Sequence, residues 1–121
     1  MHEVSLVKNI FSTLEEEFPK EELDKITTIH LKLGKLSNAE PVLMQNAFKA
    51  VTQSENRFIK VNLEIEIIPI KIFCADCNLH SIIENYSFKC HYCGRPNNNI
   101  TEGEELMISK VSFGHKSLVI D

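Results

Sequence analysis

Two pairs of cysteines constrain this chain more than any other feature of its sequence. Cys74 and Cys77 form one pair, Cys90 and Cys93 form the other, and twelve residues separate the two pairs. Two residues between cysteines let both sulfurs reach one ion from a tight turn, and two such turns complete a tetrahedral shell of four sulfurs. The spacing therefore predicts that these four cysteines bind a Zn(II) ion.

The same cysteines allow three other interpretations: two disulfides, a thioredoxin-like redox pair and a rubredoxin-like iron site. A reducing compartment disfavours disulfides, and the presence of two such pairs disfavours the redox motif. Iron remains the alternative to zinc. Because four cysteines leave no position open for water, we expect a structural ion and not a catalytic one.

The sequence assigns no role to the four histidines at positions 30, 80, 91 and 115. His80 and His91 lie beside the cysteines and could replace or tune a sulfur, but an exposed polar residue is the simpler interpretation. His30 falls on the polar side of a predicted strand, and His115 lies near the end of the chain.

Hydrophobic periodicity predicts two helices and three strands outside the cysteine-rich part. Apolar residues three or four apart predict a helix over 3–18 that ends near Pro19. Ser37 and Glu40 have the spacing of a capping box, which predicts a second helix from there with Pro41 in its first turn. Alternating apolar residues predict strands over 27–36, 61–72 and 106–113.

This order of elements predicts an α+β fold, with two helices on one face of a small three-stranded mixed sheet. We expect the first two strands to be parallel, and the second and third to pair as antiparallel neighbours. Residues 1–72 and 106–121 would form this α/β domain, and residues 73–105 an inserted zinc-ribbon-like module with four cysteine ligands. Because so short an insertion cannot build a sufficient core, we expect the ion to hold it together.

Composition and charge exclude several classes of function. The 121 residues are 43% hydrophobic and 25% charged, which is typical of a folded chain, and the net charge is −4. No basic block or stripe is present, so nucleic acid is disfavoured as a partner. No apolar run reaches the length of a membrane span, and the start lacks the pattern of a signal peptide. We therefore expect a cytoplasmic protein with no membrane partner.

The first three residues form a second candidate metal site. The amine of Met1 and the amide and Nδ1 nitrogens of His2 can close adjacent chelate rings around one ion, and the amide of Glu3 can add a nitrogen. Deprotonated nitrogens in a plane suit Ni(II) or Cu(II), and the carboxylates of Glu3 and Glu40 are candidate oxygen ligands. Taken alone, this pattern does not distinguish a metal site from an ordinary chain terminus.

Several segments together resemble one known family. A start of MHEVSLVKNI, a strand ending in LGKLSNAEP, a helix containing AFKAV, and then CADC and CHYC closely resemble the hydrogenase maturation nickel metallochaperone family, HypA/HybF. The resemblance covers nearly the whole chain in the same order. It implies a set of nickel ligands and a set of structural zinc ligands: Met1, His2, Glu3 and Glu40 for nickel, and Cys74, Cys77, Cys90 and Cys93 for zinc.

The resemblance implies a metal carrier, not an enzyme. Its cargo would be Ni(II), delivered for [NiFe]-hydrogenase maturation. Its partners would be a HypB-type nickel GTPase and the [NiFe]-hydrogenase large-subunit precursor, with urease maturation proteins added in some members. The alternative is a zinc-ribbon module that binds a nucleic acid or a transcription complex, for which basic and aromatic residues around the cysteines would be needed. A rubredoxin-like electron carrier is the third interpretation.

Overall fold

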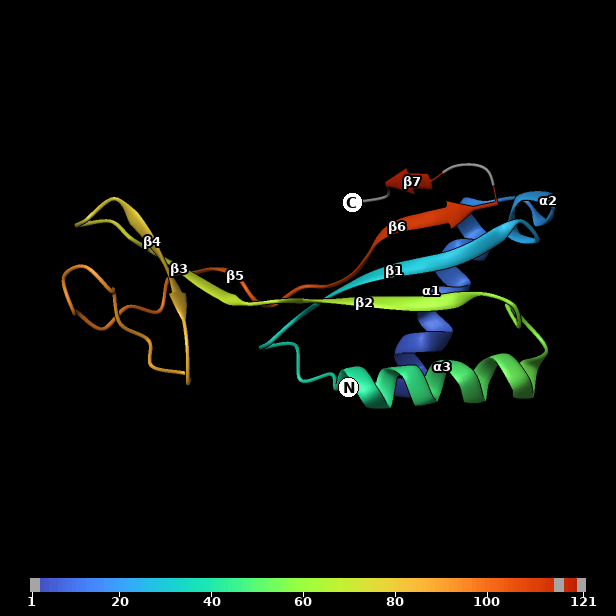
Figure 1. Ribbon diagram of the computed structural model, residues 1–121, viewed down its shortest axis with the longest axis horizontal. Helices are drawn as coiled ribbons and strands as arrows, with labels where there is room; N and C mark the ends of the chain where they lie inside the picture. The colour runs from blue at the N-terminus through green and yellow to red at the C-terminus, as the bar shows by residue number, and fades with distance from the viewer. Residues whose placement is uncertain (1–2, 115–116, 120–121) are drawn as a thin grey trace. The chain divides into compact units, whose positions relative to one another are not determined.

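The computed structural model describes residues 3–114 and 117–119, which fall into two compact units (Figure 1). Unit 1 contains the described residues up to Lys32, then Asn38–Glu66, and those from Met107 onward. Unit 2 contains Leu33–Ser37 and Ile67–Leu106. Each unit is described by itself below.

Unit 1 combines two long helices, one short helix and a four-stranded sheet. The helices are α1 (Glu3–Glu17), α2 (Lys20–Leu23) and α3 (Pro41–Glu55). The strands are β1 (Ile26–Gly34), β2 (Asn62–Ile68), β6 (Leu106–Phe113) and β7 (Ser117–Val119), in the order β2-β1-β6-β7. β1 and β2 run in the same direction and β6 runs in the opposite one (Figure 1). The predicted α+β class with a mixed sheet is confirmed.

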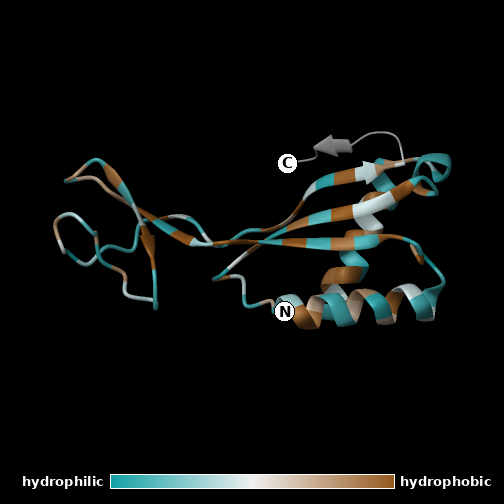
Figure 2. Cartoon of the chain, viewed as in Figure 1, coloured by the Kyte–Doolittle hydropathy of each residue, from teal (hydrophilic) through white to brown (hydrophobic). Residues whose placement is uncertain are grey.

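The helices bury the apolar face of this sheet. α1 packs against α3, and hydrophobic and hydrophilic residues alternate along β1 (Figure 2). The opposite face of the sheet is polar: His30 contacts Glu64 and Ser112 there. Phe18, just beyond α1, packs edge-on against Phe113 of β6, with ring centroids 5.6 Å apart. The buried side chains of α1 and α3 include Val7, Phe11, Leu14, Met44, Phe48 and Val51.

A charged network joins α1 to the end of α3. Arg57 donates hydrogen bonds of 2.6 and 2.7 Å to the two carboxylate oxygens of Glu15, and it also pairs with Glu55. Its guanidinium lies 5.1 Å from the centre of the Phe11 ring, which adds a cation–π contact. The hydrogen bond from Arg57 lowers the pKa of Glu55, and the bond to Glu15 raises the pKa of Arg57. These contacts give the side chain of Arg57 a structural role.

Three details of the sequence prediction are wrong. The sheet has a fourth strand, and β6 pairs with β1 instead of β2. The insertion before β6 is too long to act as a tight hairpin, and long loops close at little extra entropic cost, so the chain can return on the far side of β1. The single strand predicted over 61–72 is divided at Pro69, which has no N–H to continue a ladder, into β2 and a strand of unit 2.

The second helix also begins later than the capping box predicts. Its N-cap is Glu40, whose side chain makes no capping hydrogen bond, and Pro41 is the first helical residue. If Ser37 were the N-cap, Pro41 would be the fourth helical residue, the first whose amide must donate within the helix. Proline has no such amide but fits the first position, so it determines where α3 starts.

Unit 2 is built on a three-stranded antiparallel sheet of order β4-β3-β5. Its strands are β3 (Ile70–Cys74), β4 (Leu79–Ile83) and β5 (Ile100–Glu102), and Ile70 pairs with Ile83 while Cys74 pairs with Leu79. One face carries a small core of Ile70, Ile72 and Ile83, against which Leu36, Phe88 and Ile100 pack. The cysteine-rich part thus has an apolar cluster of its own, which the sequence interpretation did not include.

Two glycines approach closely in unit 2. A Cβ atom on Gly34 would overlap the carbonyl oxygen of Gly103, and Gly103 itself has a φ of +119°. Only a residue without a side chain fits at position 34, because the obstacle is backbone and not a flexible side-chain end. This contact holds the end of β1 against the segment that follows β5.

We expect Gly34→Ala to destabilise unit 2 by about 3 kcal/mol, the upper part of the range for overpacking. The chain has two tyrosines and no tryptophan, and both tyrosines, Tyr86 and Tyr92, lie in unit 2, so tyrosine fluorescence during urea unfolding reports on this unit. Gly114→Ala is the matched control, because nothing lies within 4 Å of its added Cβ. Equal urea midpoints for the two variants would contradict the expectation.

No helix among the residues that the structure describes is both long and apolar enough to cross a bilayer.

Candidate metal centre

The four cysteines of the two predicted pairs come together in unit 2. Cys74 is the last residue of β3, Cys77 lies in the turn before β4, and Cys90 and Cys93 lie between β4 and β5. Their Sγ atoms all lie within 4.8 Å of one another, and none forms a disulfide. Among the described residues, this is the only group of three or more His, Cys, Asp or Glu side chains arranged for a metal ion.

The sulfur positions fit a tetrahedral zinc shell. The Sγ atoms of Cys74 and Cys93 are 3.8 Å apart, as are those of Cys77 and Cys90. Zinc–sulfur bonds of about 2.3 Å in a regular tetrahedron place the sulfurs about 3.8 Å from one another. A disulfide needs about 2.05 Å between sulfurs, so these thiols are arranged for a shared ion and not for a covalent bond.

The two cysteine turns have the same backbone design. The amide of Asn78 donates to the carbonyl of Cys74 at 2.7 Å, and the amide of Gly94 donates to that of Cys90 at 2.9 Å. The donor in each turn has a positive φ, +58° for Asn78 and +75° for Gly94. Glycine and asparagine are the residues that adopt this conformation most readily. Each of these two residues directly follows the second cysteine of its pair in the sequence.

The backbone also favours ionised sulfur at one of the four positions. Backbone N–H groups of Cys93 and then of Tyr92 lower the pKa of Cys90 to about 6, and the Tyr92 amide lies 3.4 Å from that sulfur. Burial, followed by hydrogen bonding with the neighbouring thiols, raises the pKa of Cys77 to about 12. Because the thiolate is the form that binds a metal, a cation among the sulfurs is what allows all four to ionise together.

Residues next to the cysteines make polar contacts that hold the cysteine-bearing loops in place, but they do not add a metal ligand. Asp76 and Arg95 form an exposed ion pair of 2.8 Å, and the amide of His91 donates to Ser81 Oγ at 3.1 Å. The ring of His80 packs against that of Phe73 in a tilted arrangement, with centroids 5.0 Å apart. Neither histidine belongs to the group of potential metal ligands among the described residues.

The predicted nickel ligands are described only in part. Met1 and His2 lie outside the described residues. Glu3 is the first residue of α1 and is half-buried, and Glu40 is the exposed N-cap residue of α3. Within the part of the chain that the structure describes, neither glutamate belongs to a group of three potential ligands, so the nickel site stays a prediction.

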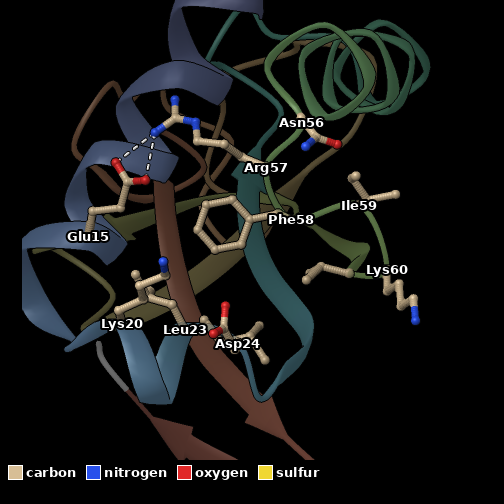
Figure 3. A pocket seen from close by; sticks show the side chains of 11 residues that line it. Glu15, Lys20, Leu23, Asp24, Asn56, Arg57, Phe58, Ile59 and Lys60 are labelled. Atoms are coloured by element: carbon tan, nitrogen blue, oxygen red, sulfur yellow. Dashed lines mark hydrogen bonds and ion pairs between the residues drawn. The ribbon is translucent and has the colours of Figure 1, made fainter.

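A pocket in unit 1 offers no comparable chemistry. It has a volume of about 580 Å³ and lies where the end of α1, the short helix α2 and the chain after α3 meet (Figure 3). Its lining includes Phe58 and the Arg57–Glu15 ion pair, whose charges neutralise each other. No group of potential metal ligands lines it among the described residues.

His30, to which the sequence assigned no role, has two polar contacts. Its Nε2 lies 3.0 Å from Ser112 Oγ, and its Nδ1 lies 3.3 Å from a carboxylate oxygen of Glu64. Both contacts join strands of the polar sheet face, so they satisfy the imidazole within the fold. His115 lies outside the described residues.

The fold and the site together define an α+β protein that carries a four-cysteine metal-binding unit. A family model described as "Hydrogenase/urease nickel incorporation, metallochaperone, hypA" matches residues 1–113. The chain therefore belongs to the HypA family, which confirms the resemblance found in the sequence.

Individual relatives agree with this assignment. The chain is similar to hydrogenase maturation factor HypA of Desulfitobacterium hafniense, with 33% identity over 111 residues that cover 92% of this chain and 96% of the relative. It is 31% identical over 111 residues to the protein of the same description from Campylobacter jejuni, covering 92% and 97%. The solution structure of the Ni metallochaperone HypA from Helicobacter pylori covers 93% of this chain and 97% of its own, with a TM-score of 0.63. Its 24% identity makes this a likeness of fold.

Proposed function

We propose that this protein is a nickel metallochaperone that binds Ni(II) at its N-terminus and delivers it for [NiFe]-hydrogenase maturation. The observation that carries the proposal is the match of residues 1–113 to the family of hydrogenase and urease nickel incorporation proteins. Delivery to urease maturation is a second use that the family description includes. The protein would act in the cytoplasm, the compartment that the sequence predicts.

The proposed nickel site combines Met1, His2 and Glu3, with Glu40 as a candidate oxygen ligand. Support comes from the position of Glu3 at the start of α1, because amides in the first helical turn have no acceptor within the helix. A metal can take such a nitrogen without breaking the helical ladder. The carboxylate of Glu40 makes no capping hydrogen bond to α3, so helix capping does not compete for it.

The proposed zinc site consists of Cys74, Cys77, Cys90 and Cys93, and its role is structural. The two sulfur separations of 3.8 Å fit a tetrahedral zinc shell, and four protein ligands leave no position for a substrate. When bound, the ion supplies folding free energy to unit 2. Nickel is the cargo and zinc is the resident ion in this proposal.

A carrier must bind its ion and also release it to the next protein. A terminal site with few ligands allows release more readily than a closed shell of four thiolates does. We propose that a HypB-type nickel GTPase contacts unit 1, so that the ion travels a short distance, and that the [NiFe]-hydrogenase large-subunit precursor is the final acceptor. The zinc-ribbon alternative gains no support, since Arg95, a cation beside the cysteines, is paired with Asp76.

Binding of the GTPase should depend on the exposed side of α1. Lys8 and Glu15 are exposed on α1, but Lys8 pairs with Glu55 at the end of α3 and Glu15 pairs with Arg57 just after it. Ser12 and Glu16 are exposed as well, and neither takes part in an ion pair that these helices share. Ser12→Arg together with Glu16→Lys should therefore weaken GTPase binding at least ~tenfold while leaving the fold intact.

The measurement is calorimetry of the nickel-loaded chain with the purified GTPase, followed by nickel transfer against a coloured chelator. Tyr92→Ser is the control, because this exposed side chain lies in unit 2. Deleting residues 1–18 would be a poor test, since Phe11 and Leu14 are fully buried and their loss would unfold unit 1. Strong binding by the α1 variant and weak binding by Tyr92→Ser would contradict the proposed surface.

A further inference from the structure

The linker segment Leu33–Ser37 comprises the last two residues of β1 and the three residues that follow, and it is part of unit 2, although α3 belongs to unit 1. Backbone hydrogen bonds attach it to a residue just before β3 and to residues that follow β5. The amide of Gly34 donates to the carbonyl of Glu105 at 2.7 Å, that of Lys35 to Ile68 at 3.0 Å, and that of Leu36 to Gly103 at 2.8 Å. Three consecutive amides of the linker segment therefore donate hydrogen bonds to the backbone of unit 2.

Leu36 anchors the linker segment by its side chain. It packs against the core cluster of Ile70, Ile72 and Ile83. Every other residue of this cluster comes from within 67–106, so Leu36 is the contribution of the linker segment to the core of unit 2. A cluster this small loses a large share of its apolar contacts when one member leaves.

The hairpin formed by β3 and β4 carries the core cluster and two of the four cysteines. β3 holds Ile70 and Ile72 and ends at Cys74, and β4 begins two residues after Cys77. Cys74 pairs with Leu79 at one end of this hairpin, and Ile70 pairs with Ile83 at the other. Any ion that fixes the cysteine end of β3 and β4 therefore also fixes the register that presents the core cluster to Leu36.

We propose that metal binding by the four cysteines and docking of the linker segment are one cooperative event. Loss of the ion would then release the stretch of chain that leads into α3 and its N-cap, Glu40. This inference rests on zinc ligation by the cysteines, which is part of the proposed function, but not on nickel binding. The physical basis is that a unit with so small a core takes its folding free energy from the metal, and segments that depend on it unfold together.

Hydrogen exchange of the full-length untagged chain tests this inference, after metal analysis has established that zinc is bound. Removing zinc with a chelator should speed exchange at the amides of Gly34, Lys35 and Leu36 at least ~tenfold, together with those of β3. Amides of α3 around Phe48 and Val51 should change by less than about twofold, because their side chains are buried in unit 1.

The outcomes separate the two ideas. A chain purified without zinc or another bound metal contradicts the proposed metal site. A chain that binds zinc but exchanges the linker amides equally fast with and without it contradicts the coupling while the metal site stands.

Coupling must also act in the reverse direction, because linkage between two binding events is reciprocal. Leu36→Ala should therefore bind zinc about tenfold more weakly than the parent chain, as measured by competition with a chelator. Leu43→Ala is the matched control, since this leucine is 50% exposed in α3. If Leu36→Ala does not fold, Leu36→Met keeps most of the volume and should give a smaller loss of zinc affinity. Equal zinc affinities for the Leu36 and Leu43 variants would overturn the proposal.

Discussion

Replacing Cys74 or Cys93 with serine should abolish stoichiometric zinc binding and unfold unit 2, while unit 1 keeps its helices and sheet. Zinc contributes roughly 10–16 kcal/mol of apparent binding free energy in zinc-finger peptides, far more than the small core of unit 2 can replace. Unit 1 should persist because its core of helix and strand side chains contains none of the cysteines. We expect the loss of order to cover residues 67–106 and also Leu33–Ser37.

Three measurements check this expectation on the same samples. Elemental analysis should give one zinc per parent chain and close to none per variant, far-ultraviolet circular dichroism should retain the helical signal, and hydrogen exchange should locate the disordered part. Asp76→Asn is the control, because this residue lies between two of the cysteines and, among the described residues, forms its ion pair with the exposed Arg95 and not with a cysteine. Stoichiometric iron would change the identity of the ion, and disulfides with no bound metal would refute the site.

The sequence predicts those parts of the fold that local patterns determine. The helix predicted over 3–18 is observed as Glu3–Glu17, and the strand predicted over 106–113 is observed as β6 (Leu106–Phe113). Each has a clear periodicity and little competition from proline or glycine. The cysteine cluster was equally predictable, because the spacing within each pair allows few geometries around one ion.

The errors arise where a distant contact or one special residue decides the outcome. Pro69 divides a run of alternating residues that looks continuous, so β2 and β3 enter different sheets. The position of β6 beside β1 depends on how the chain returns from unit 2, which periodicity does not encode. Leu36 resembles the end of a strand in the sequence, and its place in the core of unit 2 depends on residues more than thirty positions away.

The N-terminal metal site is the part of the proposal that rests most on chemistry and family membership. Its two central residues, Met1 and His2, lie outside the described residues, and only Glu3 and Glu40 have described positions. Hydrophobic periodicity does not predict such a site, because a free amine and one imidazole form no repeating pattern. The amine itself is therefore what an experiment must change.

Nickel affinity should fall on the order of 100-fold in His2→Ala, a change of about 2.7 kcal/mol in binding free energy. The substitution removes an imidazole that closes a chelate ring with the terminal amine and the first amide. Zinc content and thermal stability should stay at the parent values, because terminal residues carry little core packing. Mass spectrometry of the untagged chain first establishes that Met1 carries a free amino group.

Adding one glycine before Met1 should weaken nickel binding as strongly as His2→Ala does. The extension keeps every side chain but converts the amine of Met1 into an amide and moves the imidazole away from the new terminus, so the adjacent chelate rings no longer form. Calorimetric nickel titration of the parent, the extended chain and His2→Ala is the decisive comparison, with His91→Ala as the control because its imidazole is exposed in unit 2. Glu40→Gln, measured alongside, should reduce affinity less, since a single carboxylate completes the site without closing a ring. Equal affinities for the parent, the extended chain and His2→Ala would mean that nickel does not bind at this terminus.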